Sequence, residues 1–262
     1  MGIDVGATLC KLALQRGEIH TARHASSDLP AVRDSAAGWG PRRIGATGGG
    51  AATLGSALTG VPVRLVAEFD AWAAGARLLA ALEGVALPSR YLLVSLGTGT
   101  SVLAIGPGGA ARAGGTALGG GTLLGLGRLL LGLESFAAIS RLAGTGDRRR
   151  VDLLISDVYR EARFTLPGDL TAASFAKLDS DRSEDLAHAL MGLVGENVAL
   201  ISGALARNAV AEAIVYCGST LEDNPVLVGI LREITEVFGQ RPLFLARGAF
   251  CGAVGAAALA AD

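Results

Sequence analysis

The chain of 262 residues is long enough to bury a sizeable core in one or two domains, and half of its residues are apolar. A formal net charge of −1 excludes the basic footprint of a nucleic-acid-binding protein, so no nucleic-acid partner is expected. Mean hydropathy is high at +0.45, but charges and glycines interrupt every apolar run before about 18 residues, which predicts no transmembrane helix and no membrane partner.

The first third of the chain is predicted to form strands that end at small-residue turns, followed by one amphipathic helix. Apolar and polar residues alternate over residues 2–24, which predicts two strands joined by a turn at Arg16-Gly17-Glu18. A short strand is expected at residues 42–47, before three glycines. Apolar residues at three- and four-residue spacings predict a helix from Glu68 to about Leu82.

A break at residues 88–90 precedes a strand at residues 91–96 and sets the expected domain boundary. We expect an N-terminal domain of residues 1–88 and a C-terminal domain of residues 89–262. Ser183 is expected to cap a long helix that ends near residue 208. The other expected elements of the second half are helices at 122–133, 135–142, 151–159, 225–238 and 252–261, and strands at 214–217 and 242–246. This order predicts a duplicated α/β fold with ligand between two halves.

Three turns of small residues carry phosphate-binding chemistry. They are Gly2-Ile-Asp-Val-Gly-Ala-Thr-Leu-Cys-Lys11, Val94-Ser-Leu-Gly-Thr-Gly-Thr-Ser-Val102 and Gly114-Gly-Thr-Ala-Leu-Gly-Gly-Gly-Thr122. Without Cβ atoms in the way, backbone N–H groups can approach a phosphate closely. A strand, an acidic residue, a small-residue turn and then a lysine suit a nucleotide phosphate and its Mg²⁺. The sequence therefore predicts a protein that handles ATP.

These turns belong to an ordered set of motifs that resembles the type II pantothenate kinases, within the acetate/sugar kinase–Hsp70–actin superfamily. The resemblance covers nearly the whole chain. Besides the three turns, the matching motifs are Thr47-Gly-Gly-Gly50, Glu68-Phe-Asp-Ala71, Leu166-Pro-Gly-Asp-Leu-Thr-Ala-Ala-Ser-Phe175, Tyr216-Cys-Gly-Ser219 and Phe250-Cys-Gly-Ala-Val-Gly-Ala256. The resemblance implies two actin-like (ribonuclease H-like) domains with ATP in the cleft between them, and ATP-dependent phosphorylation of pantothenate to 4′-phosphopantothenate in coenzyme A biosynthesis.

The chemistry of individual residues agrees with this assignment. Asp4, at a strand end, can hold Mg²⁺ directly or through water, and Lys11 can meet the charge of a transferring phosphoryl group. The resemblance makes Glu68 the catalytic base that accepts the proton of the attacking hydroxyl. The remaining residues expected to contact ATP phosphates are Gly6, Thr8, Gly97, Thr98, Gly119, Gly120, Gly121 and Thr122.

Pantothenate carries one carboxylate, and a guanidinium group matches a carboxylate in geometry and charge. Arg112, expected at the end of a loop, is therefore the predicted carboxylate anchor, with Thr100, Ser101 and Gly115 beside it as substrate-binding residues. The resemblance also implies a homodimer formed through the apolar helices of the second half. Coenzyme A or acyl-CoA is a candidate inhibitor.

The three cysteines, Cys10, Cys217 and Cys251, have no metal-binding spacing and are expected to be reduced core residues. The N-terminus lacks the basic and apolar regions of a signal peptide, and these two features together predict a cytoplasmic protein.

The sequence departs from the family pattern at Ala7, where a second glycine is usual, and at Arg247-Gly-Ala, where the family has His-Glu-Gly. Two alternatives therefore stay open. The same fold can phosphorylate another small hydroxylated substrate, such as an amino sugar, or it can serve as a non-catalytic nucleotide sensor in which Ala7 has weakened turnover.

Overall fold

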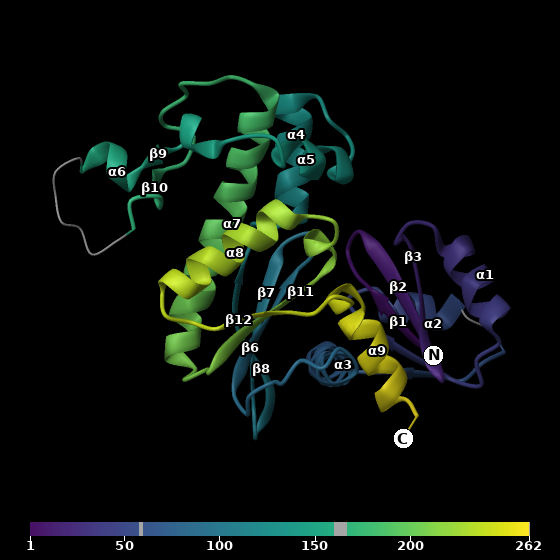
Figure 1. Ribbon diagram of the computed structural model, residues 1–262. Coiled ribbons are helices and arrows are strands. Elements are labelled where there is room, and N and C mark those ends of the chain that lie inside the picture. The colour runs from purple at the N-terminus through teal and green to yellow at the C-terminus, as the bar shows by residue number, and fades with distance from the viewer. Residues whose placement is uncertain (58–59, 160–166, 262) are drawn as a thin grey trace.

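The computed structural model describes residues 1–57, 60–159 and 167–261. Two five-stranded sheets lie on either side of a pair of helices (Figure 1). The first sheet has the order β3-β2-β1-β4-β5, with β1, β2 and β3 antiparallel and β4 and β5 parallel to β1. Its strands are β1 (Gly2–Val5), β2 (Leu9–Arg16), β3 (Glu18–Ala25), β4 (Ile44–Thr47) and β5 (Val63–Leu65).

The second sheet repeats this topology strand for strand. Its order is β8-β7-β6-β11-β12, with an antiparallel meander of β6, β7 and β8 and two strands parallel to β6. The strands are β6 (Tyr91–Leu96), β7 (Thr100–Gly106), β8 (Gly109–Thr116), β11 (Ala213–Cys217) and β12 (Pro242–Phe244). The fold is therefore duplicated, as predicted.

The helices α3 (Glu68–Leu82) and α9 (Cys251–Leu259) fill the space between the sheets (Figure 1). Glycines let their backbones approach closely: a Cβ on Gly75 would lie 1.8 Å from the Cys251 carbonyl oxygen, and one on Gly255 would lie 1.7 Å from that of Ala71. Helix α9 also packs on β1 and β4. The C-terminal end of the chain thus completes the core beside the first sheet, and the domain boundary at residue 88 stays a prediction.

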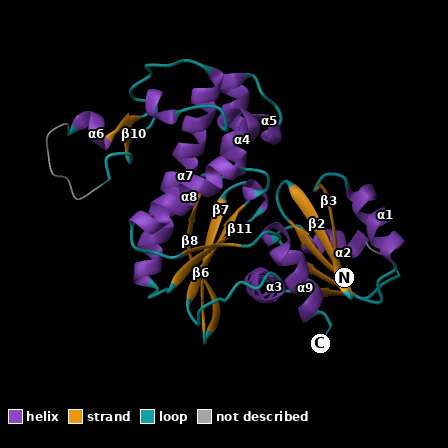
Figure 2. Cartoon of the chain, viewed as in Figure 1, coloured by secondary structure: helices purple, strands orange, loops and turns teal. Residues whose placement is uncertain are grey.

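The outer faces of the sheets are covered by the remaining long helices (Figure 2). Helices α1 (Leu29–Trp39) and α2 (Ala51–Ala57) accompany the first sheet. Helices α4 (Gly120–Leu131), α5 (Phe136–Ala143), α7 (Ser183–Asn208) and α8 (Pro225–Val237) accompany the second. Between α5 and α7 the chain forms a small two-stranded sheet and a short helix: β9 (Leu153–Leu154), α6 (Ile155–Val158) and β10 (Thr171–Ala173).

Within the described residues, α7 is long and apolar enough to cross a membrane by length and composition. However, 67% of its most apolar 18-residue window is buried inside the protein. Helices α4 and α5 meet the same criterion only as a pair, and they are bent by 76° at the break between them. Because most of its apolar surface is buried, α7 has the character of a core helix.

Several predicted elements differ from the structure. Residues 2–25 form three strands rather than two, because the chain also turns at Gly6–Thr8. The expected helix at 151–159 is reduced to α6, and β9 precedes it. Ser183 is the first residue of α7, and its neighbour Arg182 occupies the cap position without a side-chain bond. The motif residue Leu166 lies outside the described residues.

Candidate functional site

The turn after β1 and the turn after β6 face each other across the two halves of the fold. The hydroxyl oxygens of Thr8 and Thr98 lie 2.9 Å apart, within hydrogen-bond distance. Both side chains are exposed. The duplicated topology explains this meeting, since each turn joins the first two strands of its sheet. The predicted phosphate turns containing Gly6 and Gly97 are therefore brought together.

The glycine-rich start of α4, with Gly119 at its N-cap, packs directly onto the turn at residues 97–99. The N–H groups of Gly120 and Gly121 donate to the carbonyl oxygens of Gly97 and Thr98 at 2.8 and 2.9 Å. The N–H of Gly119 donates to the Thr122 hydroxyl at 3.3 Å. These three amides already have protein acceptors, so a phosphate contact from them stays a prediction.

Space also requires glycine at these three positions. A Cβ on Gly119 would lie 2.7 Å from the Gly99 Cα, closer than real Cβ atoms approach. A Cβ on Gly121 would lie 2.8 Å from the Thr98 Cγ2. The buried Thr100 hydroxyl donates to the Leu118 carbonyl at 2.7 Å and fixes the same arrangement. Close backbone packing thus accounts for these glycines, and the Thr100 hydroxyl has a protein acceptor.

Asp4 lies at the end of β1 opposite Lys11, its register partner on β2. The carboxyl group is buried, with 6% of the residue exposed. Burial raises the pKa of Asp4 to about 6; Lys11 opposes this shift, Glu68 reinforces it, and a hydrogen bond from Trp72 opposes it. The structure therefore brings Asp4, Lys11 and Glu68 into one electrostatic group beside the facing turns.

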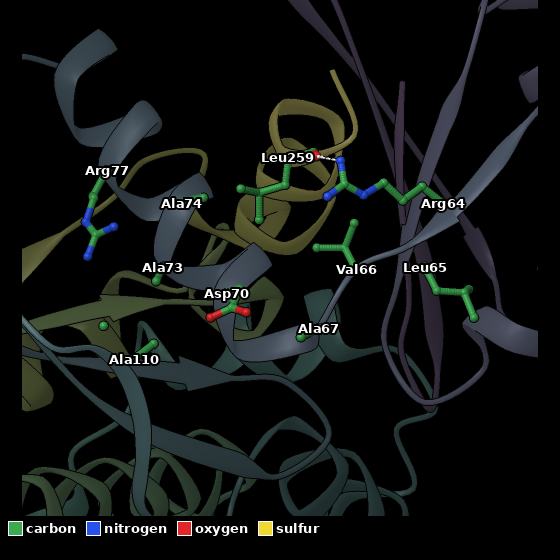
Figure 3. Close-up of a pocket in the computed structure, with 11 residues that line it drawn as sticks. Arg64, Leu65, Val66, Ala67, Asp70, Ala73, Ala74, Arg77, Ala110 and Leu259 are labelled. Carbon is green, nitrogen blue, oxygen red and sulfur yellow. Dashed lines mark hydrogen bonds between the residues drawn. The ribbon is translucent and has the colours of Figure 1, made fainter. Parts of the chain in front are cut away.

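Glu68 begins α3, directly after β5 and a short connection. Asp70, two residues further along the helix, points to a different side. It lines a cavity of about 360 Å³ together with Arg64, Arg77 and the first residues of β8 (Figure 3). Glu68 is absent from the lining of that cavity. This cavity is therefore separate from the Asp4 group.

Arg112 lies within β8 rather than in a loop, so this part of the expectation was wrong. Its Nε donates weakly to the Gly114 carbonyl at 3.4 Å. A Cβ on Gly115 would lie 3.5 Å from its Nη2, and Gly115 is the register partner of Ser101. The structure thus groups Arg112, Ser101 and Gly115. Among the described residues, no hydrogen bond or ion pair joins this group to Asp4 or Glu68.

Two interactions near the site were not predicted from the sequence: the ion pair of Arg23 with Glu222, and the approach of Trp72 to Asp4. Arg23 of β3 forms a two-bond ion pair with Glu222, at 2.5 and 3.0 Å, and its guanidinium lies 5.5 Å from the ring centre of Phe250. Glu222 also lines a cavity of about 220 Å³ that Gly218 and residues 244–246 border. In the sequence, the alternation of residues along β3 indicates only that Arg23 is exposed. The spacing of apolar residues in α3 indicates only that Trp72 packs in the core.

The site offers a divalent cation the carboxylate oxygens of Asp4 and not a complete set of protein ligands. The described residues contain no group of three or more His, Cys, Asp or Glu side chains that could hold a metal ion. A single buried carboxylate beside the predicted phosphate turns nevertheless fits Mg²⁺, which usually binds through one or two carboxylates, substrate phosphates and water.

Comparison with known proteins gives matches along almost the whole chain. The sequence model of the Fumble family matches residues 20–259. A type II pantothenate kinase from Staphylococcus aureus (strain USA300) is 33% identical over 266 residues, covering 98% of this chain and 97% of that protein.

Two solved structures share the fold. One is an activator of the 2-hydroxyisocaproyl-CoA dehydratase from Clostridium difficile with bound ADPNP, with a TM-score of 0.63 and 16% identity over 99% of this chain and 92% of that chain. The other is a ROK family glucokinase from Streptomyces griseus in complex with glucose and AMPPNP, with a TM-score of 0.61 and 17% identity over 98% and 97%. These likenesses confirm the predicted duplicated fold.

Proposed function

This chain belongs to the Fumble family of type II pantothenate kinases, and on that premise we propose that it transfers the γ-phosphoryl group of ATP to the primary hydroxyl of pantothenate. The product is 4′-phosphopantothenate, in the first step of coenzyme A biosynthesis. The structural observation that carries the proposal is the grouping of Asp4, Lys11 and Glu68 beside the two facing turns.

ATP is proposed to lie with its phosphates between the turns after β1 and β6. The hydroxyls of Thr8 and Thr98 are exposed there and bond to each other, so both can turn to a phosphate oxygen. Gly6 and Gly97 let the backbone of each turn come close. The Lys11 ammonium adds a positive charge that can stabilise the transferring phosphoryl group. The segment Gly119–Thr122 holds the turn after β6 in place through backbone hydrogen bonds.

Asp4 is proposed to hold Mg²⁺, directly or through water. When bound, the cation would neutralise charge on the nucleotide phosphates. Asp4 can serve this purpose because its carboxylate is fixed and carries a negative charge above a pH of about 6.

Glu68 is proposed to accept the proton of the pantothenate hydroxyl as that oxygen forms its bond to the γ-phosphorus and the bond to the β-phosphate oxygen breaks. Arg112 is proposed to bind the substrate carboxylate through its guanidinium fork, with Ser101 and Gly115 beside it. The exposed position of Arg112 leaves its donors available to a carboxylate.

The chain is further proposed to act in the cytoplasm as a homodimer, with residues 1–88 and 89–262 as its two domains. Exposed apolar residues on α4 support a dimer contact in the second half: Leu129 is 78% exposed and Leu130 is 46% exposed. Coenzyme A and its thioesters remain candidate inhibitors.

A coupled ADP-release assay with ATP and Mg²⁺ tests the proposed activity. Pantothenate should stimulate release, whereas N-acetylglucosamine and a reaction without acceptor should not. Release that depends only on the amino sugar would keep the kinase chemistry and reject the substrate. ATP binding without release for any acceptor would support the sensor alternative.

A further inference from the structure

The carboxylate of Asp4 is enclosed on both sides by positions that carry no side chain. A Cβ on Gly48 would lie 2.8 Å from Oδ1, and a Cβ on Gly252 would lie 2.4 Å from Oδ2. Gly252 is the second residue of α9, so the carboxylate lies near the positive end of that helix. The surrounding backbone therefore leaves little room for the carboxylate to rotate.

Trp72 reaches the same carboxylate from α3. The hypothetical Gly252 Cβ would lie 2.9 Å from the Trp72 Nε1 as well as 2.4 Å from Oδ2, which places both atoms at one spot beside α9. The indole N–H lies beside the carboxylate and acts to lower the pKa of Asp4. Trp72 follows Glu68 by four residues, so both side chains project from the same face of α3.

The indole itself is held in place by packing. Trp72 is partly buried and packs against the apolar cluster between the two sheets, which includes Ala73, Ala76 and Val254. A ring fixed in this way can keep its N–H at a constant position. An indole N–H is also a neutral donor. It can orient a carboxylate and leave the negative charge of that carboxylate available to a cation. An arginine or lysine at the same place would cancel part of this charge.

We propose that Trp72 is a positioning residue for the phosphoryl-transfer site: its indole N–H fixes the Asp4 carboxylate in the orientation that receives the divalent cation. This inference rests on the proposed function, because it assumes that Asp4 holds Mg²⁺. It also ties the cation site and Glu68 to one rigid helix, so that both groups keep the same relation to the nucleotide.

The test compares Trp72→Phe with Trp39→Phe. The chain contains only these two tryptophans, and Trp39 lies at the end of α1, on the other face of the first sheet. Each variant loses one indole N–H and keeps an aromatic ring. Binding of a fluorescent ADP analogue is titrated with Mg²⁺. The half-saturating Mg²⁺ concentration should rise roughly tenfold in Trp72→Phe, as for other residues that orient metal ligands, and stay unchanged in Trp39→Phe.

Trp72→His, which restores a ring N–H donor, should recover part of the loss. An unchanged Mg²⁺ dependence in Trp72→Phe would overturn the proposal. If Trp72→Phe does not fold, the Trp39→Phe protein supplies the answer, because Trp72 is then the sole tryptophan. Its fluorescence should change when Mg²⁺ joins the nucleotide complex, and no change would overturn the proposal. These readouts require no turnover, so a parent protein inactive on pantothenate would reject the proposed function separately.

Discussion

The hydroxyls of Thr8 and Thr98 lie 2.9 Å apart, although 90 residues separate them in the chain. Each belongs to the turn that joins the first two strands of its sheet, and the two sheets have the same topology. The duplicated fold therefore brings two matching turns together at one place.

Glu68→Gln should abolish most of the turnover while leaving nucleotide binding intact. The amide has nearly the shape of the carboxylate but cannot accept the hydroxyl proton. Loss of a general base typically lowers the rate by about 10²–10⁴-fold. Steady-state kinetics and calorimetric titration with ATP check the two parts. Asp70→Asn is the matched control, because Asp70 lines the separate cavity on another side of α3 (Figure 3). Equal kcat in Glu68→Gln and parent would exclude Glu68 as the base.

Arg112→Ala should raise the KM for pantothenate by roughly 10- to 100-fold, because a charge-assisted bond to a carboxylate contributes about 1.5–3 kcal/mol. The KM for ATP should change little. Arg33→Ala, which removes an exposed arginine from α1, is the control. Full pantothenate turnover at an unchanged KM would reject Arg112 as the carboxylate anchor.

Asp4→Asn should stabilise the fold near neutral pH while impairing activity. Burial raises the pKa of Asp4 in the folded protein from 3.8 to about 6, so the folded state binds this proton more tightly than the unfolded state. The ionised carboxylate therefore costs stability above about pH 6. This cost fades as the pH falls from about 6 to 3.8, and it is absent below that range.

Denaturant unfolding of Asp4→Asn and parent measures this difference directly. The variant should gain stability on the order of 3 kcal/mol at most at about pH 7.5, and the gap should shrink to roughly a third of that value at about pH 4.5. Titrating groups that do not interact with Asp4 are common to both proteins and cancel in the comparison. A gap that does not vary with pH would contradict the assigned burial cost.

Breaking the Arg23–Glu222 ion pair should speed nucleotide release. The pair joins β3 to the segment after β11, and Glu222 lines the cavity beside Gly218. Partly exposed pairs contribute about 0.2–1 kcal/mol, so Arg23→Glu or Glu222→Arg should accelerate release of a fluorescent ADP analogue several-fold at most. The double exchange should restore the parent rate, and added salt should reduce the difference.

The Arg149–Asp147 pair, which lies on the loop before β9, provides a control for a general effect of charge. Reversing it should leave the release rate unchanged. If the two single exchanges at Arg23 and Glu222 behave like this control, the pair does not hold the halves together around the nucleotide.

The sequence predicted the local elements well where periodicity or glycine turns define them. The helix from Glu68 to Leu82 and the strand from Tyr91 to Leu96 have the expected bounds. Helix α1 escaped prediction, although Asp28 caps it and Gly40 ends it in the left-handed conformation. Arg112 was expected at the end of a loop, yet ladder pairing with β7 makes that segment a strand.

Relations between distant residues could not be read in the same way. Motif order alone suggested that Asp4 and Glu68 belong to one site; their proximity depends on how β4, β5 and α3 pack beside β1. The three glycines at the start of α4 suggested a phosphate cradle, which stays a prediction; their close backbone packing on Gly97 and Thr98 became visible only in the structure. Arg23 and Glu222 are 199 residues apart in the chain, and no local sequence pattern predicts that they form an ion pair.

The most direct test of the central claim is mass-spectrometric identification of the reaction product. Parent protein incubated with ATP, Mg²⁺ and pantothenate should yield 4′-phosphopantothenate and ADP in equal amounts, and Glu68→Gln should yield almost none while still binding ATP. ADP without phosphopantothenate, or equal product from both proteins, would contradict the assignment of this chain as a pantothenate kinase that uses Glu68 as its base.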